Sequence, residues 1–214
     1  MAGRPWQCRP GVVGSPAPMR RLSPLDRLVG RADAVLRTTT RTGLRQQRPY
    51  PAAGVGDTAS LDAAARRHAA GLMRVNHAGE VCAQALYVGQ ALLARNARTE
   101  AALAQAAREE GDHLFWCEQR LAELDAHPSR LNPAWFAGAL AIGAAAALAG
   151  DRVSLGFVEE TERQVVKHLD GHLEALPADD QRSRAVVRAM REDEARHAGD
   201  AAARGARRLP RVVR

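Results

Sequence analysis

The sequence predicts an all-α protein, built as a four-helix bundle with an additional apolar helix between the second and third bundle helices. Alanine and leucine dominate the chain, and few segments alternate β-branched and polar residues as strands do. Four long segments instead repeat apolar residues at helical spacing. With 214 residues, the chain is long enough for one domain with a sizeable core.

The first 60 residues are predicted to lie outside the bundle. Residues 1–22 lack the continuous apolar core of a signal peptide, and their Pro, Gly and Arg content predicts a disordered leader. Ser23 and Pro24 form a helix start, and apolar residues line one side of 23–38. This amphipathic helix would lie on a membrane or pack on the bundle. The composition of 39–60 is that of a linker.

The bundle itself is predicted over 61–205, with helices at 61–95, 99–126, 151–176 and 178–204, followed by a basic tail at 206–214. Between the second and third helices lies an uncharged segment, 131–150. Its length is at the lower limit for a membrane span, and its alanine and glycine content makes it weakly hydrophobic. We expect a helix that dips into a membrane surface or crosses the core, and a full span is the less favoured alternative.

Composition narrows the expected partners. The formal net charge is +7, and only 4% of the residues are aromatic, which fits attraction to anionic membrane lipids. The sequence has neither an RNA-binding aromatic motif nor a zinc-finger spacing, so we expect no nucleic acid partner. The three cysteines, Cys8, Cys82 and Cys117, are too few and too scattered for a disulfide framework or a cysteine-based metal site.

Two ExxH motifs are the strongest functional signal. Because residues three apart share one helix face, the Glu and His of each motif can reach a common metal. Each motif follows another glutamate on the preceding predicted helix, by 30 residues in one case and 32 in the other. Two such hairpins related by a twofold axis would bring six ligands together, as in di-iron carboxylate proteins. The six candidates are Glu80, Glu110, His113, Glu162, Glu194 and His197.

The third bundle helix offers three carboxylates, and helical periodicity chooses among them. Glu162 shares its side of the helix with Leu155 and Leu169, so it is predicted to face the core. Glu159 and Glu160 share their sides with charged and polar residues. A carboxylate buried among apolar residues is costly unless it is paired or ligates a metal. We therefore choose Glu162 as the ligand and keep Glu159 as the alternative.

The charge and residue types of this set indicate the metal. Four facing carboxylates could not all stay ionised on their own, whereas two ferrous ions would neutralise them. Carboxylate and imidazole ligands suit iron that binds dioxygen, and manganese is the alternative. A ligand histidine usually needs an acidic partner for its other ring nitrogen, and Glu109 and Asp193 could each orient the histidine of the other ExxH helix. Tyr87 is expected in the core with its hydroxyl near the site.

Three further histidines are assigned weaker roles. His77, three residues before Glu80, is expected to pack beside the site or support it from outside the ligand set. His168 and His172 form an HxxxH pair that could bind metal, but the sequence offers no third partner, so a surface role is the favoured interpretation.

Four segments carry a wider resemblance: GLMRVNHAGEVCAQALYVGQALLAR, REEGDHLFWCEQRL, VSLGFVEETERQVVKHL and REDEARHAGDAA. They resemble the bacterial demethoxyubiquinone hydroxylases of ubiquinone biosynthesis, and the similarity spans about 24–203. The resemblance implies a ferritin-like di-iron bundle, associated peripherally with the cytoplasmic side of the cytoplasmic membrane. By position it assigns Glu80, Glu110 and His113 to one iron and Glu162, Glu194 and His197 to the other, with Glu110 and Glu194 bridging. It also suggests a role for His168 in proton or electron delivery.

The resemblance further implies a monooxygenase that uses dioxygen to hydroxylate the ring of a polyprenylated demethoxy-benzoquinol. Electrons would come from NADH, directly or through a reductase, or from the quinol itself; the sequence has no Gly-rich nucleotide-binding loop. Membrane lipids and other ubiquinone-biosynthesis proteins are the expected partners. The rival interpretations are a ferritin-like iron store or ferroxidase, a rubrerythrin-like peroxidase, which the missing cysteine pairs disfavour, and a metal-free helical scaffold on a membrane surface.

Overall fold

The computed structural model describes residues 46–56 and 61–210; the predicted leader and the predicted helix at 23–38 lie outside the described residues. Within these ranges the chain is helical throughout its regular structure, which confirms the predicted all-α class. The elements are α2 (Ala63–Leu93), α3 (Ala97–Glu123), α4 (Asn132–Leu148), α5 (Asp151–Ala175) and α6 (Gln181–Ala203).

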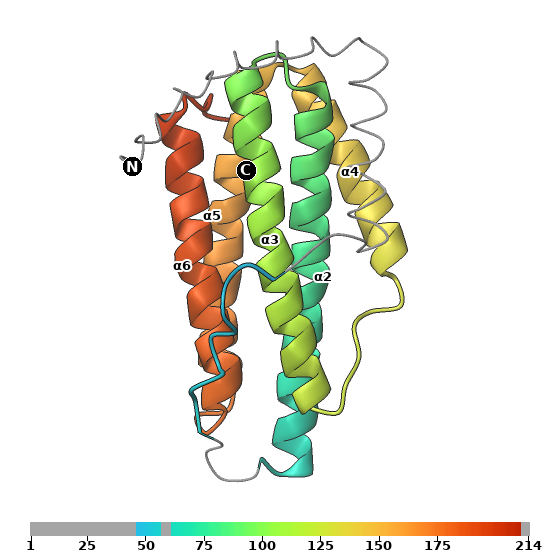
Figure 1. Ribbon diagram of the computed structural model, residues 1–214, viewed down its shortest axis with the longest axis vertical. Helices are drawn as coiled ribbons and strands as arrows, with labels where there is room; N and C mark the ends of the chain where they lie inside the picture. Colours follow the sequence, from blue (N-terminus) through green and yellow to red (C-terminus); the bar gives the residue numbers. More distant parts are fainter. Residues whose placement is uncertain (1–45, 57–60, 211–214) are drawn as a thin grey trace, which may run out of the picture.

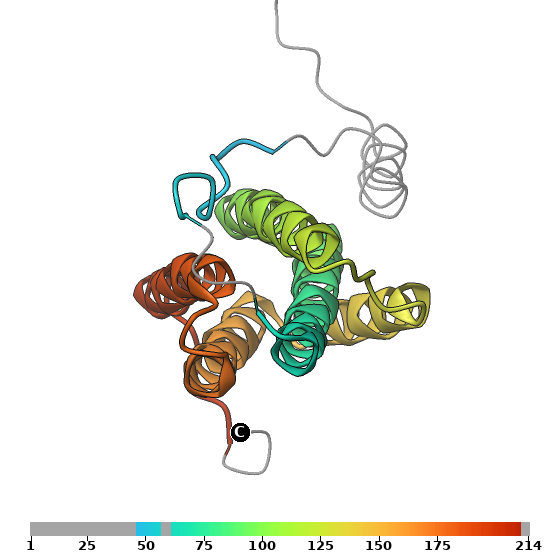
Figure 2. The ribbon, with the colours of Figure 1, turned by 90° about the horizontal axis from the view of Figure 1, so that it is seen from below.

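Four of these helices form two antiparallel hairpins, α2 with α3 and α5 with α6, which stand side by side (Figure 1). Seen from below, the four helices occupy the corners of a bundle, and α4 lies outside it beside α2 (Figure 2). The backbones lie closer together within each hairpin than between the two hairpins. The side chains that fill the space between the hairpins therefore decide how the bundle is held together.

Short polar residues begin three of the four bundle helices. The side chain of Asp62 accepts a hydrogen bond from the Ala65 amide (2.7 Å) before α2, and Asn96 accepts one from Arg98 (2.8 Å) before α3. Asp180 caps α6 in the same way, through the Ser183 amide (2.9 Å). These contacts satisfy backbone donors that the first helical turn leaves without partners, which is why the helices begin at these residues.

Helix α4 packs on the outer side of α2 through a stripe of small residues, Ala139, Gly143 and Ala147. The two backbones come close enough that a Cβ at Gly143 would lie 2.3 Å from the carbonyl oxygen of Leu86, and one at Gly89 would lie 2.3 Å from that of Leu140. The predicted apolar helix is thus a surface helix of the bundle and does not cross its core. Among the described helices, none has the combination of length and hydrophobicity needed to cross a membrane.

Candidate metal centre

All six predicted ligands lie at mid-height in the space between the two hairpins. Each is buried, and the most exposed of them, His197, exposes 5% of its surface. Potential ligand atoms of four of them lie within 4.8 Å of one another, and all four side chains are buried: Glu80 from α2, Glu110 and His113 from α3, and Glu194 from α6. Glu162 from α5 and His197 from α6 adjoin this group.

The two histidines meet the carboxylates through their Nδ1 atoms. His113 Nδ1 lies 3.2 Å from Glu80, 3.0 Å from Glu110 and 3.0 Å from Glu194. His197 Nδ1 lies 3.0 Å from Glu194 and 3.3 Å from Glu110. Glu110 and Glu194 therefore each reach both histidines, whereas Glu80 meets His113 alone in this set of contacts. Glu110 and Glu194 thus lie between the two imidazoles.

Glu162 is the carboxylate of α5 that points into the bundle. It is 2% exposed, and its Oε1 accepts a hydrogen bond of 2.7 Å from the hydroxyl of Tyr87. Glu159 instead pairs with Arg163 (2.6 Å), and Glu160 accepts a hydrogen bond from Gln164 (3.1 Å). The apolar periodicity of α5 thus separates one inward carboxylate from two outward ones.

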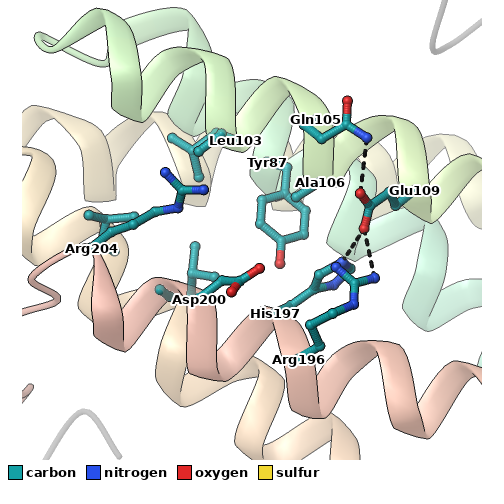
Figure 3. A pocket seen from close by; sticks show the side chains of 13 residues that line it. Tyr87, Leu103, Gln105, Ala106, Glu109, Arg196, His197, Asp200 and Arg204 are labelled. Carbon is teal, nitrogen blue, oxygen red and sulfur yellow. Dashed lines mark hydrogen bonds and ion pairs between the residues drawn. The ribbon is translucent and has the colours of Figure 1, made fainter.

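The second nitrogen of each histidine meets an acid from the opposite hairpin. His113 Nε2 on α3 lies 2.9 Å from Asp193 on α6, and His197 Nε2 on α6 lies 2.8 Å from Glu109 on α3 (Figure 3). Arg196 contacts both acids, at 2.9 Å for Glu109 and 3.0 Å for Asp193. Partial burial opposes ionisation of Glu109, but hydrogen bonds from His197, Gln105 and Arg196 lower its pKa to about 2. These charged contacts orient both rings.

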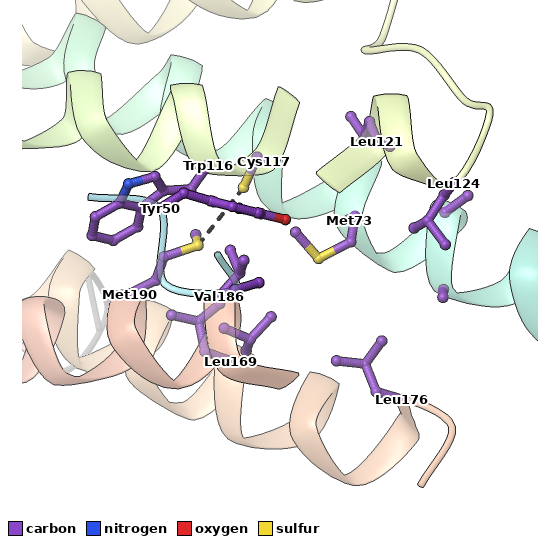
Figure 4. Packing of buried hydrophobic residues seen from close by; sticks show 14 residues of the cluster. Tyr50, Met73, Trp116, Cys117, Leu121, Leu124, Leu169, Leu176, Val186 and Met190 are labelled. Atoms are coloured by element: carbon purple, nitrogen blue, oxygen red, sulfur yellow. Dashed lines mark hydrogen bonds between the residues drawn. The ribbon is translucent and has the colours of Figure 1, made fainter. Parts of the chain in front are cut away.

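Residues 46–56, which sequence composition assigned to a linker, dock on the bundle beside this site. Arg48 lies 2.6 Å from Asp193 and 3.1 Å from Asp112, and its guanidinium stacks over the ring of Trp116 at 4.6 Å. Tyr50 is buried in the adjacent apolar cluster with Trp116 and Met190 (Figure 4). Helical periodicity could not identify Arg48, because an irregular segment has no repeat that shows where its side chains point.

Burial and neighbouring charges give the carboxylates of this site different pKa values. Burial raises the pKa of Glu80 and of Glu162 well above the usual range. Burial also opposes ionisation of Glu110, but His113 and His197 hold its pKa below the usual range. Burial lowers the pKa of His197, yet the carboxylates of Glu110 and Glu194 outweigh it and raise that pKa to about 11. Without a metal, protonated imidazoles thus carry the positive charge of the site.

The donor set fits divalent metal ions better than it fits protons. Nδ1 of His113 has a single hydrogen, yet it faces three carboxylates at 3.0–3.2 Å. Among the described residues, Glu162 Oε2 has no hydrogen-bond partner, and Glu110 Oε1 and Glu194 Oε1 make no hydrogen bond beyond an ion-pair contact with a histidine Nδ1, at 3.3 Å and 3.0 Å. Buried oxygens of this kind are costly unless a cation occupies the space they face. The residues present therefore suit a cluster of carboxylate and imidazole ligands around metal.

The remaining histidines lie away from this ligand set. His77 is buried, with Nε2 3.0 Å from Glu118 and Nδ1 3.2 Å from the side-chain amide of Asn132, so it joins α2 to α3 and to the start of α4. The rings of His168 and His172 pack together on α5, with centroids 4.0 Å apart. His168 also lines a cavity that reaches the ligands.

Two openings reach the centre from different sides. A cavity of about 330 Å³ lies between α2 and α5, and Glu80, Glu162 and Glu194 belong to its lining. A smaller pocket of about 90 Å³ lies between α3 and α6, where Tyr87 and His197 form part of the wall (Figure 3). Three candidate ligand carboxylates line the larger cavity, together with apolar side chains that include Val75 and Val165.

A buried cluster of carboxylates and histidines, contributed by all four helices of an antiparallel bundle, is the arrangement of the ferritin-like di-metal carboxylate proteins. Residues 67–213 match the sequence model of the family described as "Ubiquinone biosynthesis protein COQ7". This match covers more than half of the chain, and the chain belongs to that family.

Curated relatives agree with the family assignment over nearly the whole chain. A "3-demethoxyubiquinol 3-hydroxylase" of Xanthomonas oryzae pv. oryzae (strain PXO99A) is 59% identical over 197 residues, which are 92% of this chain and 90% of the relative. Proteins of the same name from Polynucleobacter necessarius subsp. necessarius (strain STIR1) and Ralstonia pickettii (strain 12J) are 54% and 56% identical. These alignments cover 90% and 89% of this chain and 91% and 92% of the relatives.

Proposed function

We infer that this protein is a 3-demethoxyubiquinol 3-hydroxylase, which uses dioxygen to place a hydroxyl group on the ring of a polyprenylated demethoxy-benzoquinol. The buried set of four glutamates and two histidines carries this inference, because it supplies the ligands that such an oxidation needs. The relatives named above support the reaction and the substrate, since their identity to this chain exceeds 50% over about nine-tenths of its length.

Iron is the metal we propose, since carboxylate and imidazole ligands suit iron in dioxygen chemistry. Iron held by the six ligands supplies the redox chemistry, and the protein supplies position and environment. Asp193 and Glu109 hold the histidine rings from outside the ligand set. Burial, followed by the charge of Glu162, raises the pKa of Tyr87, so its hydroxyl keeps its proton and donates it in a hydrogen bond to Glu162.

The cavity between α2 and α5 is the proposed site of the quinol ring. Its volume of about 330 Å³ lies at the lower end of the range for small-molecule pockets, which suits one aromatic ring. Its base reaches three of the ligands, and the exposed side chain of Val75 lies at its wall. The isoprenoid tail attached to the ring would run along such apolar residues towards the outside of the bundle.

A peripheral membrane location is part of this proposal, because the substrate is a lipid. Helix α4 has no charged residue, and it exposes about half or more of the surface of Trp135, Ile142 and Leu148. It packs on α2 and reaches α5, the two helices that border the cavity. A membrane in contact with these apolar side chains would lie near the route of the tail, and the basic net charge would favour anionic lipids.

The membrane proposal can be tested by flotation with vesicles that contain anionic phospholipid. The double variant Ile142→Glu, Leu148→Glu is expected to bind several-fold less than the unmodified protein, because each carboxylate opposes burial in the lipid interface. Ala101→Glu, which adds a carboxylate to an exposed position of α3, is the matched control and should bind nearly as well as the unmodified protein. Equal flotation of all three proteins would exclude α4 as the contact.

The reaction is tested by the quinone content of a strain that lacks this gene. The deletion strain should accumulate demethoxyubiquinone, and the intact gene should restore ubiquinone. A gene carrying Glu194→Ala should fail to do so, even though the protein accumulates to a normal level. An unchanged quinone profile in the deletion strain would overturn the proposed reaction in a strain with no second enzyme for this step.

A further inference from the structure

Besides the candidate ligands, the cavity between α2 and α5 is lined by a polar side chain whose hydrogen bonding the described part of the protein leaves incomplete. Asn76 lies on α2, one turn before Glu80, and it lines the cavity while exposing only 3% of its surface. Among the residues that the structure describes, its Oδ1 has no hydrogen-bond partner, and its Nδ2 reaches the sulfur of Met73 at 3.8 Å, a weak contact. A buried amide oxygen without a partner is costly, and it is expected where a ligand supplies the partner.

The backbone of α2 is bare beside this amide. Gly79 follows Asn76 by three residues, and a Cβ built there would meet no atom within 4 Å. Residues three, four and seven apart share one side of a helix. One such side of α2 lines the cavity as a continuous strip, formed by Asn76, Gly79, Glu80 and Ala83. This strip offers an amide, an open stretch of backbone and a candidate metal ligand to a flat molecule.

We propose that the side-chain amide of Asn76 recognises a ring hydroxyl of the quinol, with Oδ1 accepting the hydrogen bond, while the ring lies over Gly79. This inference rests on the proposed function, since it specifies how the same site holds its substrate. A quinol hydroxyl can donate to Oδ1, whereas an ether oxygen cannot. Asn76 therefore positions the reduced ring, and Gly79 leaves the space that the ring occupies next to the carboxylates at the base of the cavity.

The alternative roles of Asn76 explain less of this arrangement. Asn76 caps no helix end, because it lies in the interior of α2. A role in packing alone would be met better by an apolar side chain of the same size, since such a side chain leaves no buried oxygen without a partner. The geometry thus assigns Asn76 to ligand binding more readily than to the stability of the bundle.

The test uses the full-length, metal-loaded protein and two probes, measured by anaerobic titration calorimetry. One probe is a demethoxyubiquinol analogue with a short isoprenoid tail, and the other is its derivative with both ring hydroxyls O-methylated. Asn76→Leu and Asn76→Ala remove the amide, and Gly79→Leu fills the space beside it. Gly71→Leu is the matched control, because a Cβ at Gly71 also meets nothing within 4 Å and Gly71 does not line the cavity. Metal content is measured for every variant.

Asn76→Leu and Asn76→Ala are expected to weaken quinol binding about 3- to 15-fold, the effect of one lost hydrogen bond. Both should bind the O-methylated probe as the unmodified protein does and keep the full metal content. Gly79→Leu should lose measurable binding of the quinol and of the O-methylated probe, while Gly71→Leu keeps quinol binding. The Asn76 variants should thus no longer bind the quinol more tightly than its O-methylated derivative. A purely structural role of Asn76 would not produce this result.

If both Asn76 variants bind the quinol as tightly as the unmodified protein does, the proposed role of Asn76 is overturned. Tight quinol binding by Gly79→Leu would overturn the location of the ring in this cavity. Loss of metal in both Asn76 variants would likewise overturn the proposal, because it would show that Asn76 supports the metal centre. If the unmodified protein neither binds nor hydroxylates the quinol probe, the proposed function itself fails. The three results above can be told apart from this failure, because in each of them the unmodified protein still binds the quinol.

Discussion

At the scale of single residues, the site depends on which carboxylates the bundle buries. Glu162 is buried with no basic partner in the described part of the chain, whereas Glu159 and Glu160, within one turn of it on α5, bind Arg163 and Gln164. A buried carboxylate is destabilising unless it binds a cation or accepts hydrogen bonds. The position of Glu162 therefore has a functional cause, and its removal should have opposite effects on metal binding and on the stability of the metal-free protein.

Glu162→Gln is expected to lower the bound iron and to reduce hydroxylation at least 100-fold, since one ligand carboxylate is lost. In the metal-free protein the same change should raise the free energy of unfolding by about 1–2 kcal/mol, because burial raises the pKa of Glu162 and penalises its charged form. Iron analysis and thermal unfolding measure the two effects. Glu160→Gln, on the outer side of α5, should change neither, and full iron loading of Glu162→Gln would exclude Glu162 as a ligand.

His172 provides a test of pH dependence away from the metal centre. Partial burial, followed by the charges of His168 and His68, lowers its pKa from 6.5 to about 4. In this pH range the unfolded chain binds a proton that the folded protein does not. The contribution of His172 to stability is therefore fully present above pH 6.5 and is lost as the pH falls towards 4.

We expect the melting temperature of the metal-free His172→Gln variant to gain on that of the unmodified protein as the pH falls from 7 to 5, because the variant lacks this loss of stability. Because the ring is only about half buried, solvent screening limits the effect to about 1 kcal/mol, or roughly 2–4 °C. His127→Gln is the control, since His127 is exposed and its ring Nδ1 lies 2.8 Å from the carbonyl oxygen of the neighbouring Pro128. Identical pH profiles of the unmodified protein and His172→Gln would contradict the expectation.

At the scale of elements, α4 is distinguished by how closely it approaches α2. Its buried residues are alanine and glycine, Leu140 packs partly buried against the bundle, and Trp135, Ile142 and Leu148 are exposed. Dispersion contacts between two closely spaced backbones hold it in place, since large interlocking side chains are absent from the buried stripe. A single added methyl group at the point of closest approach should therefore separate the two helices.

Gly143→Ala and Gly89→Ala are each expected to lower the free energy of unfolding by about 1–3 kcal/mol, the usual cost of overpacking. In each case the added Cβ would lie 2.3 Å from a carbonyl oxygen of the partner helix, and a backbone atom cannot rotate away as a side chain can. Chemical denaturation measures the loss. Gly138→Ala is the matched control on α4: nothing lies within 4 Å of its Cβ, so helix propensity should raise stability by about 0.5–1 kcal/mol. Equal effects at Gly138 and Gly143 would contradict the close approach.

At the scale of the whole molecule, the candidate metal centre joins the two hairpins, together with a buried apolar cluster to which both hairpins contribute. Candidate ligands come from both hairpins, and the acids that contact the histidine Nε2 atoms cross between α3 and α6. Metal that binds the folded bundle and not the unfolded chain stabilises the bundle by mass action. The hairpin interface is therefore the part of the molecule that should depend most on metal.

Before the chelator is added, free metal is kept at about 100 times its dissociation constant. Removal of the metal should then lower the free energy of unfolding by about 3 kcal/mol. This loss corresponds to a fall of roughly 5–10 °C in melting temperature. Calorimetry measures the change, and hydrogen exchange should show the largest loss of protection in α3 and α6 near the site. The unmodified protein with metal added back is the control for reversibility. A melting temperature unaffected by the chelator would show that metal does not link the hairpins.

The sequence by itself determined the helices and the inward faces that carry the candidate ligands. Apolar periodicity has a local cause, the 3.6-residue turn of the helix, so it could distinguish Glu162 from Glu159 and Glu160 before any tertiary contact was known. The repeated order of a glutamate followed by an ExxH motif was equally a property of the chain. The HxxxH pair of α5 was visible too, although its position beside the cavity was not.

Only the tertiary structure decided what depends on packing between distant segments. It placed Arg48 of an irregular segment against Asp193, and it set α4 outside the bundle on a stripe of small residues. It also left the amide oxygen of Asn76 without a hydrogen-bond partner among the described residues, at the wall of a cavity. These features arise from contacts between residues far apart in sequence, and no local repeat records them, because their energies depend on distances that exist only once the hairpins have packed.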